Sequence, residues 1–517
     1  MTANQKITPM LQQYLEIKER HQDDILFYRM GDFYEMFFDD AVTASRILGI
    51  TLTARGTKND KDNRIPMCGV PHHSATGYIG KLVKSGHRVA ICEQVEDPKE
   101  AKGVVKREVV RIVTPGLVTE DQLLDDKNNR YLASVAATAN VWGLALIDIS
   151  TGEFLVTEGD DPDILFDEIH RMTPSEILFA DNSDSLENFR KDLKVTLADV
   201  CFTFRRDSIF RTGLARQALL EHFQTANLAG FGCEDLKAGI MAAGALIHYL
   251  NETQKTDLSH IRQMRLLNRQ GTLILDDTSR RNLELTQTII GGRREGSLLA
   301  TLDHTRTPMG ARLLKKNLLF PLKDAGHINR RLQTVETLQG NFSHREKLQE
   351  TLKAMYDLER LNSKVVLGSA NARDLTALKL SLARLPELRE TAKEAAILTE
   401  TTDGLDVLSD IFELLDQSVR EDGPVNLRDG GLIKSGYNVE LDELNTLLTE
   451  GKNLILALEN KEKQNTGINN LKIGFNKVFG YYLEVSKGQL GNVPDYFIRK
   501  QTLVNAERYI TPELKEF

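Results

Sequence analysis

Residues 27–38 read Phe-Tyr-Arg-Met-Gly-Asp-Phe-Tyr-Glu-Met-Phe-Phe, and this segment holds six of the 32 phenylalanines and tyrosines of the chain. The apolar run Ile25–Met30 predicts a buried strand. Asp32 and Glu35 have the spacing of a capping box, so a helix is expected to begin at Asp32, directly after the strand. Phe33 would then lie in the first turn of that helix, at the exposed corner between strand and helix.

Strands and helices continue to alternate after this segment. A helical pattern at Gly77–Lys84 is followed by an apolar strand at His87–Cys92. Val109–Val113 alternates toward Thr114-Pro-Gly116, a turn and domain boundary. We therefore predict that residues 1–116 form a small mixed α/β domain.

The next segment predicts a second α/β domain, over residues 125–256. Three apolar runs separated by short turns indicate an antiparallel meander. They are Tyr131–Ala136, Trp142–Ile149 and Glu153–Val156. A helix at Asp163–Arg171 and a strand at Glu176–Phe179 are expected to follow.

From residue 257 the hydrophobic period becomes helical. Leucines recur at helical spacing in Asp374–Leu388 and in Val439–Leu458, which predicts long helices with buried stripes. A period of two returns at Leu471–Val485 and predicts a small sheet. The chain stops at Thr511–Phe517, which has the pattern of a helix start. We expect this chain to be the front part of a longer protein.

Composition excludes several classes of protein. The chain has 517 residues, 41% hydrophobic, and a formal net charge of −8, so it can bury several cores. Its four cysteines show no Cys-x-x-Cys spacing, which argues against a zinc site or a disulfide framework. There is no secretory signal at the start, and the longest apolar stretch, Ala238–Leu250, is too short to span a bilayer. We expect a cytoplasmic protein with no membrane partner.

The overall negative charge hides a basic region. Between Thr51 and Val113 there are 12 Lys and Arg against 7 Asp and Glu, a local net charge of +5. A local basic excess is what a protein needs to bind a phosphate backbone. A solvated surface explains the same charges equally well.

Sequence motifs of common enzymes are absent. The chain has no Gly-x-x-x-x-Gly-Lys-Ser/Thr phosphate loop, no Gly-x-Ser-x-Gly and no His-Glu-x-x-His, so we expect no enzyme activity in this chain. Asp148, near the end of a predicted strand, and Glu153, across the next turn, leave a metal-dependent nuclease as an alternative. A third ligand is not evident, and a turn residue at a strand end is the simpler interpretation of Asp148.

An exposed Phe33 beside a basic surface suggests a specific use. Minor-groove proteins insert apolar side chains between base steps and kink the duplex. A mismatch has no fixed sequence, but it unstacks and bends more easily than paired DNA, so a wedge can find it. Glu35 allows two interpretations: it caps the helix, or it accepts a hydrogen bond from a base edge.

The segment Gly31–Glu35 resembles the mismatch-recognition motif of the bacterial MutS family, and further segments follow in the family's order. They are Ile65–His73, Val89–Gln94, Arg111–Gly116, Leu275–Glu284, Thr307–Leu314, Phe475–Tyr482 and Asn505–Tyr509. The resemblance runs over essentially the whole chain.

The resemblance implies a multidomain α/β plus α fold. Its parts would be a mixed α/β mismatch-recognition domain (1–116), a ribonuclease-H-like connector (125–256), a long-helix core with levers (257–444), a small β clamp inserted between lever helices (445–508) and the start of a returning lever helix (509–517).

The resemblance also implies roles for single residues. Phe33 would stack on the mispaired base and Glu35 would hydrogen-bond it. The DNA backbone would be held by Arg55, Met67, His73 and Arg107 of the first domain and by Lys477, Lys487, Arg499 and Lys500 of the clamp.

The partners implied are mismatched double-stranded DNA, a second copy of the chain in a homodimer, and a MutL-type repair protein, in the bacterial cytoplasm at the nucleoid. ATP and Mg²⁺ are expected for the full-length family member, whose ATPase domain would follow the core; no catalytic residue, metal or cofactor is expected in this chain. A MutS relative that serves recombination without reading mismatches is a further alternative. The pair Phe33 and Glu35 argues against it.

Overall fold

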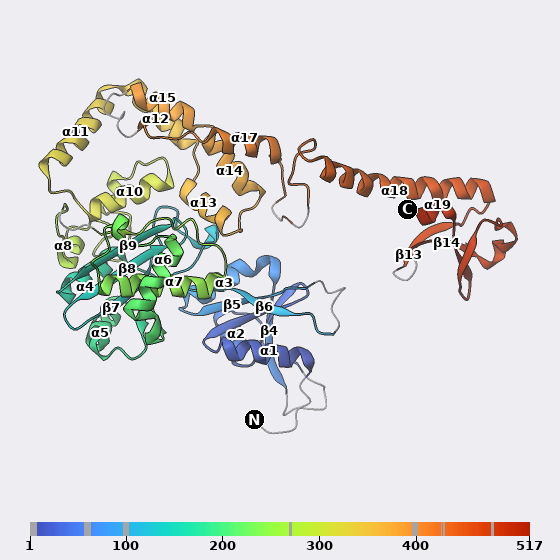
Figure 1. Cartoon of the computed structure of the whole chain (residues 1–517), viewed down its shortest axis with the longest axis horizontal. Coiled ribbons are helices and arrows are strands. Elements are labelled where there is room, and N and C mark those ends of the chain that lie inside the picture. The colour runs from blue at the N-terminus through green and yellow to red at the C-terminus, as the bar shows by residue number, and fades with distance from the viewer. Residues whose placement is uncertain are drawn as a thin grey trace. The chain divides into compact units, whose positions relative to one another are not determined.

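The computed structural model describes residues 8–55, 64–96, 103–267, 271–394, 402–424, 427, 430–476 and 480–516. The chain forms two compact units, one of residues 1–416 with 424–429 and one of residues 417–423 with 430–517. Figure 1 labels many of the elements of both units. Over the described ranges, no helix has both the length and the apolar character needed to cross a bilayer.

The first unit begins with a six-stranded mixed sheet in the order β3-β4-β2-β1-β5-β6. Its strands are β1 Asp24–Met30, β2 Phe33–Phe37, β3 Thr53–Arg55, β4 Ile65–Pro71, β5 Arg88–Gln94 and β6 Arg107–Val113. Its helices are α1 Pro9–Arg20, α2 Phe38–Leu48 and α3 Ala75–Lys84. The alternation of strands and helices predicted for this region is confirmed.

Different helices cover the two faces of this sheet. α1 packs on one face, in a buried cluster that includes Tyr14, Ile17, Leu26, Tyr28 and Phe37. α2 and α3 pack on the opposite face. Since successive side chains of a strand point to opposite faces, Phe33 and Glu35 share the α1 side of β2 with Phe37.

The prediction that a helix begins at Asp32 is wrong, because Phe33–Phe37 forms strand β2. This strand pairs antiparallel with β1 across a two-residue turn. Gly31 in that turn has a φ of 59°, which glycine adopts without strain. α2 begins only at Phe38 and has no side-chain cap, so the spacing of Asp32 and Glu35 caps nothing. Exposed or half-buried side chains alternate with buried ones along most of β2, as expected of a strand. This period of two, and not the capping-box spacing, describes the segment.

A second six-stranded sheet follows, in the order β11-β10-β7-β8-β9-β12. Its strands are β7 Leu132–Ala137, β8 Trp142–Asp148, β9 Glu153–Gly159, β10 Glu176–Ala180, β11 Cys201–Arg205 and β12 Arg265–Leu266. The meander β7-β8-β9 is antiparallel as predicted, and β10 and β11 join it in parallel.

Helices cover both faces of this sheet. α4 Pro162–Met172 and α5 Glu187–Thr196 lie on one face, and α6 Thr212–Phe223 and α7 Ala238–Gln254 lie on the other. An antiparallel meander extended by parallel strands, with helices on both faces, is the ribonuclease-H-like arrangement expected for the connector.

The rest of the first unit is helical, as its hydrophobic period predicted. The helices are α8 Asp277–Asn282, α9 Leu298–Leu302, α10 Pro308–Leu319, α11 Ala325–Gly340, α12 Phe342–Lys353, α13 Leu358–Val366, α14 Ala372–Leu382, α15 Leu385–Glu394 and α17 Ser409–Ser418, which continues into the second unit. The predicted helical stretch Asp374–Leu388 is divided between α14 and α15. Pro386 explains the division, because its ring would clash with the carbonyl of Leu382 in a continuous helix.

The second unit combines one long helix with a small sheet (Figure 1). α18 runs over Val439–Thr466, longer than predicted. Strands β13 Lys472–Asn476, β14 Gly480–Ser486, β15 Ile498–Thr502 and β16 Ala506–Ile510 form an antiparallel sheet in the order β13-β14-β16-β15. α19, Pro512–Glu516, begins where its sequence predicted, and Thr511 Oγ1 accepts a hydrogen bond from the amide of Leu514 at 3.1 Å.

Candidate nucleic-acid interface

Phe33 lies at the turn end of the β1–β2 hairpin, directly after the turn, and is 48% exposed. Four other aromatic residues of the same segment are buried, namely Phe27, Tyr28, Tyr34 and Phe37. The exposure expected of Phe33 is therefore confirmed, although a hairpin and not a helix places the ring. An exposed ring at a hairpin end can stack on a planar group that approaches from solvent.

Glu35 lies two residues along β2, on the same face as Phe33, and is half-buried. Its Oε2 atom is buried and accepts no hydrogen bond from the described residues. Arg55 Nη1 lies 3.7 Å from this oxygen. Burial raises the pKa of the Glu35 carboxyl above its ordinary value, and the charge of Arg55 offsets part of the rise. A buried acceptor without a donor costs free energy, which a donor on a ligand would recover.

Gly69 of β4 forms the floor between these two side chains. It pairs with Glu35 across the sheet. A Cβ atom at this position would lie 3.3 Å from the carbonyl oxygen of Tyr34, 3.7 Å from Glu35 Cγ and 3.9 Å from Phe33 Cδ1. Glycine therefore leaves the strand backbone open to a flat group. Sequence reasoning missed Gly69, because a glycine inside a strand carries no chemical signal of its own.

Hydrogen bonds from neighbouring segments stabilise the turn that precedes Phe33. The amide of His72 donates to the carbonyl oxygen of Asp32 at 2.9 Å. Arg29 Nε donates to the carbonyl oxygen of Gly31 at 2.5 Å, and its guanidinium lies 5.6 Å from the ring centre of Tyr34. Arg29 was also missed, since its acceptor is a backbone oxygen that the sequence does not identify.

Replacing Arg55 tests the electrostatics of this surface. We expect Arg55→Ala to raise the pKa of Glu35 further, because a charge that stabilises the carboxylate is removed while its burial remains. An NMR titration of the Glu35 side-chain carbon measures the change. The control is Arg46→Ala. Arg46 is exposed on α2, at the other face of the sheet, so its removal should not change the pKa of Glu35. An unchanged pKa in Arg55→Ala would contradict the assigned contact.

The structure places Arg107 inside the first domain, which corrects its prediction as a DNA contact. Its exposure is 8%. Its Nε donates to the carbonyl oxygen of Arg29 at 2.7 Å and its Nη1 to that of Val105 at 2.8 Å. The guanidinium also lies 4.9 Å from the ring centre of Tyr28. A phosphate would have to displace these contacts, so Arg107 is a packing residue of the first domain.

The other predicted residues of this domain lie on or next to strands near Phe33. Arg55 is exposed on β3 and faces Glu35. Met67, on β4, is half-buried opposite Phe37. His73 is exposed in the short turn after β4.

The basic residues predicted for the clamp belong to the second unit. Arg499 and Lys500 are exposed on the edge strand β15, where the pairing with β16 is irregular around Lys500. Arg499 Nη1 lies 3.7 Å from Glu507 Oε1, and 64% of its side chain remains exposed. Lys487 is exposed directly after β14. Lys477 lies outside the described residues.

Asp148 and Glu153 do not form an open metal site. Asp148 is fully buried, and its carboxylate oxygens accept hydrogen bonds from Asn129, Arg130 and Ser150. Glu153 accepts hydrogen bonds from Tyr131 and Lys316. No group of three His, Cys, Asp or Glu in the described part of the chain could hold a metal ion. The nuclease alternative has no support from this geometry.

Comparison with known families assigns nearly the whole chain. Residues 8–122 match the family model of MutS domain I, residues 130–262 that of MutS domain II, residues 278–476 that of MutS domain III and residues 436–517 that of MutS family domain IV. The four matches follow in the order predicted from the motifs.

Curated proteins give the same assignment. The chain is 49% identical over 517 residues to the DNA mismatch repair protein MutS of Desulfatibacillum aliphaticivorans, covering 99% of this chain and 58% of that protein. It is 48% identical over 515 residues to the protein of the same name from Halothermothrix orenii, covering 99% of this chain and 57% of that protein. The chain thus spans less than three fifths of the length of these relatives.

Proposed function

Because this chain belongs to the MutS family, we propose that it recognises mispaired or unpaired bases in double-stranded DNA. One observation carries the proposal: an exposed ring, Phe33, shares a strand face with a half-buried carboxylate, Glu35, whose Oε2 has no donor among the described residues. Phe33 would enter the duplex and stack on the mispaired base. Glu35 would accept a hydrogen bond from the edge of that base.

The energetics support recognition without a fixed sequence. Stacking of a base on an aromatic side chain is worth about 1–3 kcal/mol. Inserting the ring costs the unstacking and kinking of a base step, and this cost is smaller at a mismatch than in paired DNA. Glu35 adds to the contrast, because its charge is repelled by the phosphates of any duplex while its hydrogen bond forms only when the base is reached.

Glu35→Gln tests this proposal. The neutral side chain removes the repulsion between residue 35 and the phosphates, so matched DNA should bind more tightly. The complex with mismatched DNA loses the charged acceptor of its hydrogen bond. The ratio of the two affinities should fall about 10-fold. A fluorescence titration with matched and single-mismatch duplexes measures it.

The control removes the same charge elsewhere in the first domain. Glu108 is exposed on β6, with its carboxylate 2.8 Å from Lys106 Nζ. Glu108→Gln should leave the ratio of affinities as it is. If Glu35→Gln and Glu108→Gln behave alike, Glu35 does not read the base.

We assign backbone contacts to Arg55, Met67 and His73 near the wedge and to Lys477, Lys487, Arg499 and Lys500 in the clamp. Neutralising Arg499 and Lys500 together should weaken binding to matched and mismatched DNA equally. The slope of log affinity against log salt concentration should become shallower by about one for each phosphate that the variant no longer neutralises. Binding measured at several salt concentrations tests this, and weaker binding confined to mismatched DNA would contradict it.

We extend the proposal to the whole protein. It would act as a homodimer in which one subunit contributes Phe33 and Glu35, together with a MutL-type partner, at the nucleoid in the bacterial cytoplasm. ATP and Mg²⁺ would serve the whole protein. The residues of this chain do not fit a P-loop nucleotide site, since the sequence has no Gly-x-x-x-x-Gly-Lys-Ser/Thr.

A further inference from the structure

A cavity of about 360 Å³ lies in the first unit, away from the residues assigned to DNA. Its walls are the β8–β9 turn at residues 151–154, the segment at residues 260–265, and α10, with Asn129 and Glu359 at the edges. The volume is in the range that small-molecule sites occupy.

The segment that contributes the second wall is firmly attached to the connector sheet. Every third residue is buried, namely Leu258, Ile261, Met264 and Leu267. His260 Nε2 lies 2.9 Å from the carbonyl oxygen of Ile149, and Arg265 pairs with Leu155 of β9. Between the buried positions, Arg262 and Arg265 are exposed and line the cavity. Their backbone is therefore already in place for a ligand.

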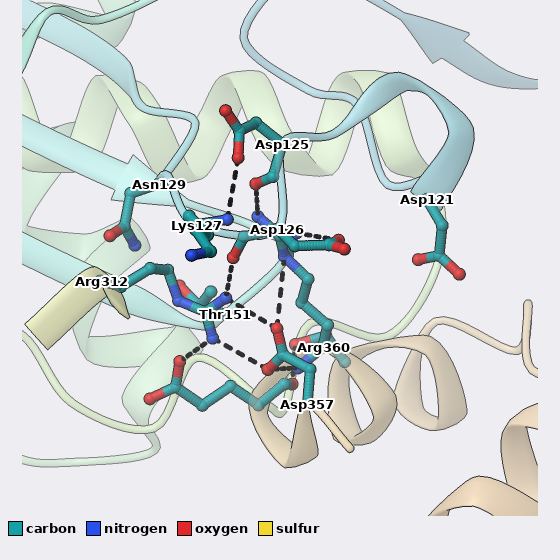
Figure 2. Close-up of polar contacts among 12 residues, drawn as sticks. Asp121, Asp125, Asp126, Lys127, Asn129, Thr151, Arg312, Asp357 and Arg360 are labelled. Atoms are coloured by element: carbon teal, nitrogen blue, oxygen red, sulfur yellow. Dashed lines mark hydrogen bonds and ion pairs between the residues drawn. The ribbon is translucent and has the colours of Figure 1, made fainter. Parts of the chain in front are cut away.

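The opposite wall presents two more cations from one face of α10. Arg312 Nη1 and Nη2 donate to the two carboxylate oxygens of Asp357 at 2.7 and 2.8 Å (Figure 2). Lys316 Nζ lies 2.5 Å from Glu153 Oε1. The charges of Arg312 and Lys316 are thus balanced by carboxylates of the protein.

Arg262 and Arg265 are not balanced in this way. Among the residues that the structure describes, neither makes an ion pair with a carboxylate. The Gln263 side-chain oxygen, in the amide orientation that satisfies both groups, accepts from Arg265 Nη2 at 2.5 Å, which orients the guanidinium without neutralising it. The cavity lining holds four cationic side chains and two carboxylates, and so carries a net positive charge.

We propose that this cavity binds a small molecule bearing a diphosphate group. Guanidinium groups match the geometry of phosphate oxygens and bind them in pairs of parallel hydrogen bonds. Arg262 and Arg265 supply two such groups from a fixed backbone. Met309 and Leu313 also line the cavity and provide an apolar surface for the rest of the molecule. The site contains no P-loop and is separate from the mismatch surface.

Methyl NMR of the full chain tests the proposal at the cavity itself. The chain has 10 methionines, and Met309 is the one that lines this cavity. With ¹³C-labelled methionine methyl groups, inorganic pyrophosphate should shift the Met309 signal in a saturable way. The signal is assigned by its disappearance in Met309→Leu. ADP is titrated separately. If ADP binds more tightly than pyrophosphate, the ligand has a flat apolar part beside its diphosphate. If the two bind equally, the cavity recognises the diphosphate alone.

The double variant Arg262→Ala/Arg265→Ala should weaken the Met309 titration at least about 10-fold. Both side chains are exposed, so the fold should persist. The control Arg281→Ala removes an arginine whose side chain is 74% exposed and outside the cavity, and it should not change the titration.

Signals of Met30 and Met67 report on the mismatch surface in the same spectrum. Shifts confined to those two methyl groups, or equal titrations of Met309 in the double variant and the unmodified chain, would overturn the proposal. Mismatch discrimination should be unchanged in the double variant, so failure here leaves the proposed function standing.

Discussion

Phe33→Ala lowers the affinity for a mismatched duplex to about that for a matched duplex, an expected decrease of about 1–3 kcal/mol in binding free energy. The reason is that the ring supplies the stacking partner, which matched DNA hardly uses. Because Phe33 is 48% exposed, its removal should change the free energy of unfolding by only about 0.5 kcal/mol or less. Fluorescence titration gives the first quantity and urea unfolding the second.

Phe37→Ala is the matched control, on the same strand and the same face. Phe37 is fully buried in the cluster beneath α1, so its truncation should cost about 3–5 kcal/mol of stability. A variant that still folds should keep its preference for mismatched DNA. If Phe33→Ala instead destabilises the chain as Phe37→Ala does and leaves that preference intact, Phe33 is a packing residue and the proposed function fails.

Arg312→Ala is expected to lower the free energy of unfolding of the first unit by about 3–5 kcal/mol. The Arg312 side chain is 5% exposed and makes paired hydrogen bonds with Asp357, whose side chain is 14% exposed. Arg312 also donates to the carbonyl oxygen of Asp126, in the segment that connects the first domain to the connector (Figure 2). Truncation leaves a largely buried carboxylate without its main cation, which is the costly way to break an ion pair.

Two control variants are compared with Arg312→Ala by urea unfolding of the same chain, and both should lower the free energy of unfolding less. Glu359→Ala removes a second partner of Arg312 whose side chain is 49% exposed, so water replaces much of the interaction and the cost should be about 1 kcal/mol or less. Arg281→Ala, with its side chain 74% exposed, should cost still less. A destabilisation in Arg312→Ala no larger than that in Glu359→Ala would show that the buried network contributes little to stability.

The secondary structure that depends on local periodicity could be predicted from the sequence. The meander at Leu132–Gly159 and the long helix α18 follow patterns in which each residue's environment is set by neighbours two to four positions away. The hairpin at Gly31 shows where such reasoning fails. The capping-box spacing of Asp32 and Glu35 agreed with a helix, but pairing with β1 and β4 decided in favour of a strand.

The candidate site divides in the same way. Phe33 and Glu35 could be selected from sequence, because an aromatic cluster that contains carboxylates is a local feature. The contact of Arg55 with Glu35 could not, since it depends on the order β3-β4-β2 in the sheet. Arg107 was misplaced because a charge in the sequence suggests a surface, whereas backbone carbonyls of remote residues make its burial possible.

The sequence by itself therefore determined the strands and helices of the segments with a clear hydrophobic period, and that Phe33 and Glu35 are candidates for reading a base. The tertiary structure alone decided that Gly69 leaves a floor between them, that Arg107 is buried, and that Arg262 and Arg265 meet Arg312 and Lys316 around one cavity. The physical reason is range. Periodicity and turn preferences act between near neighbours, while burial, ion pairing and cavity shape are set by residues that only the folded chain brings together.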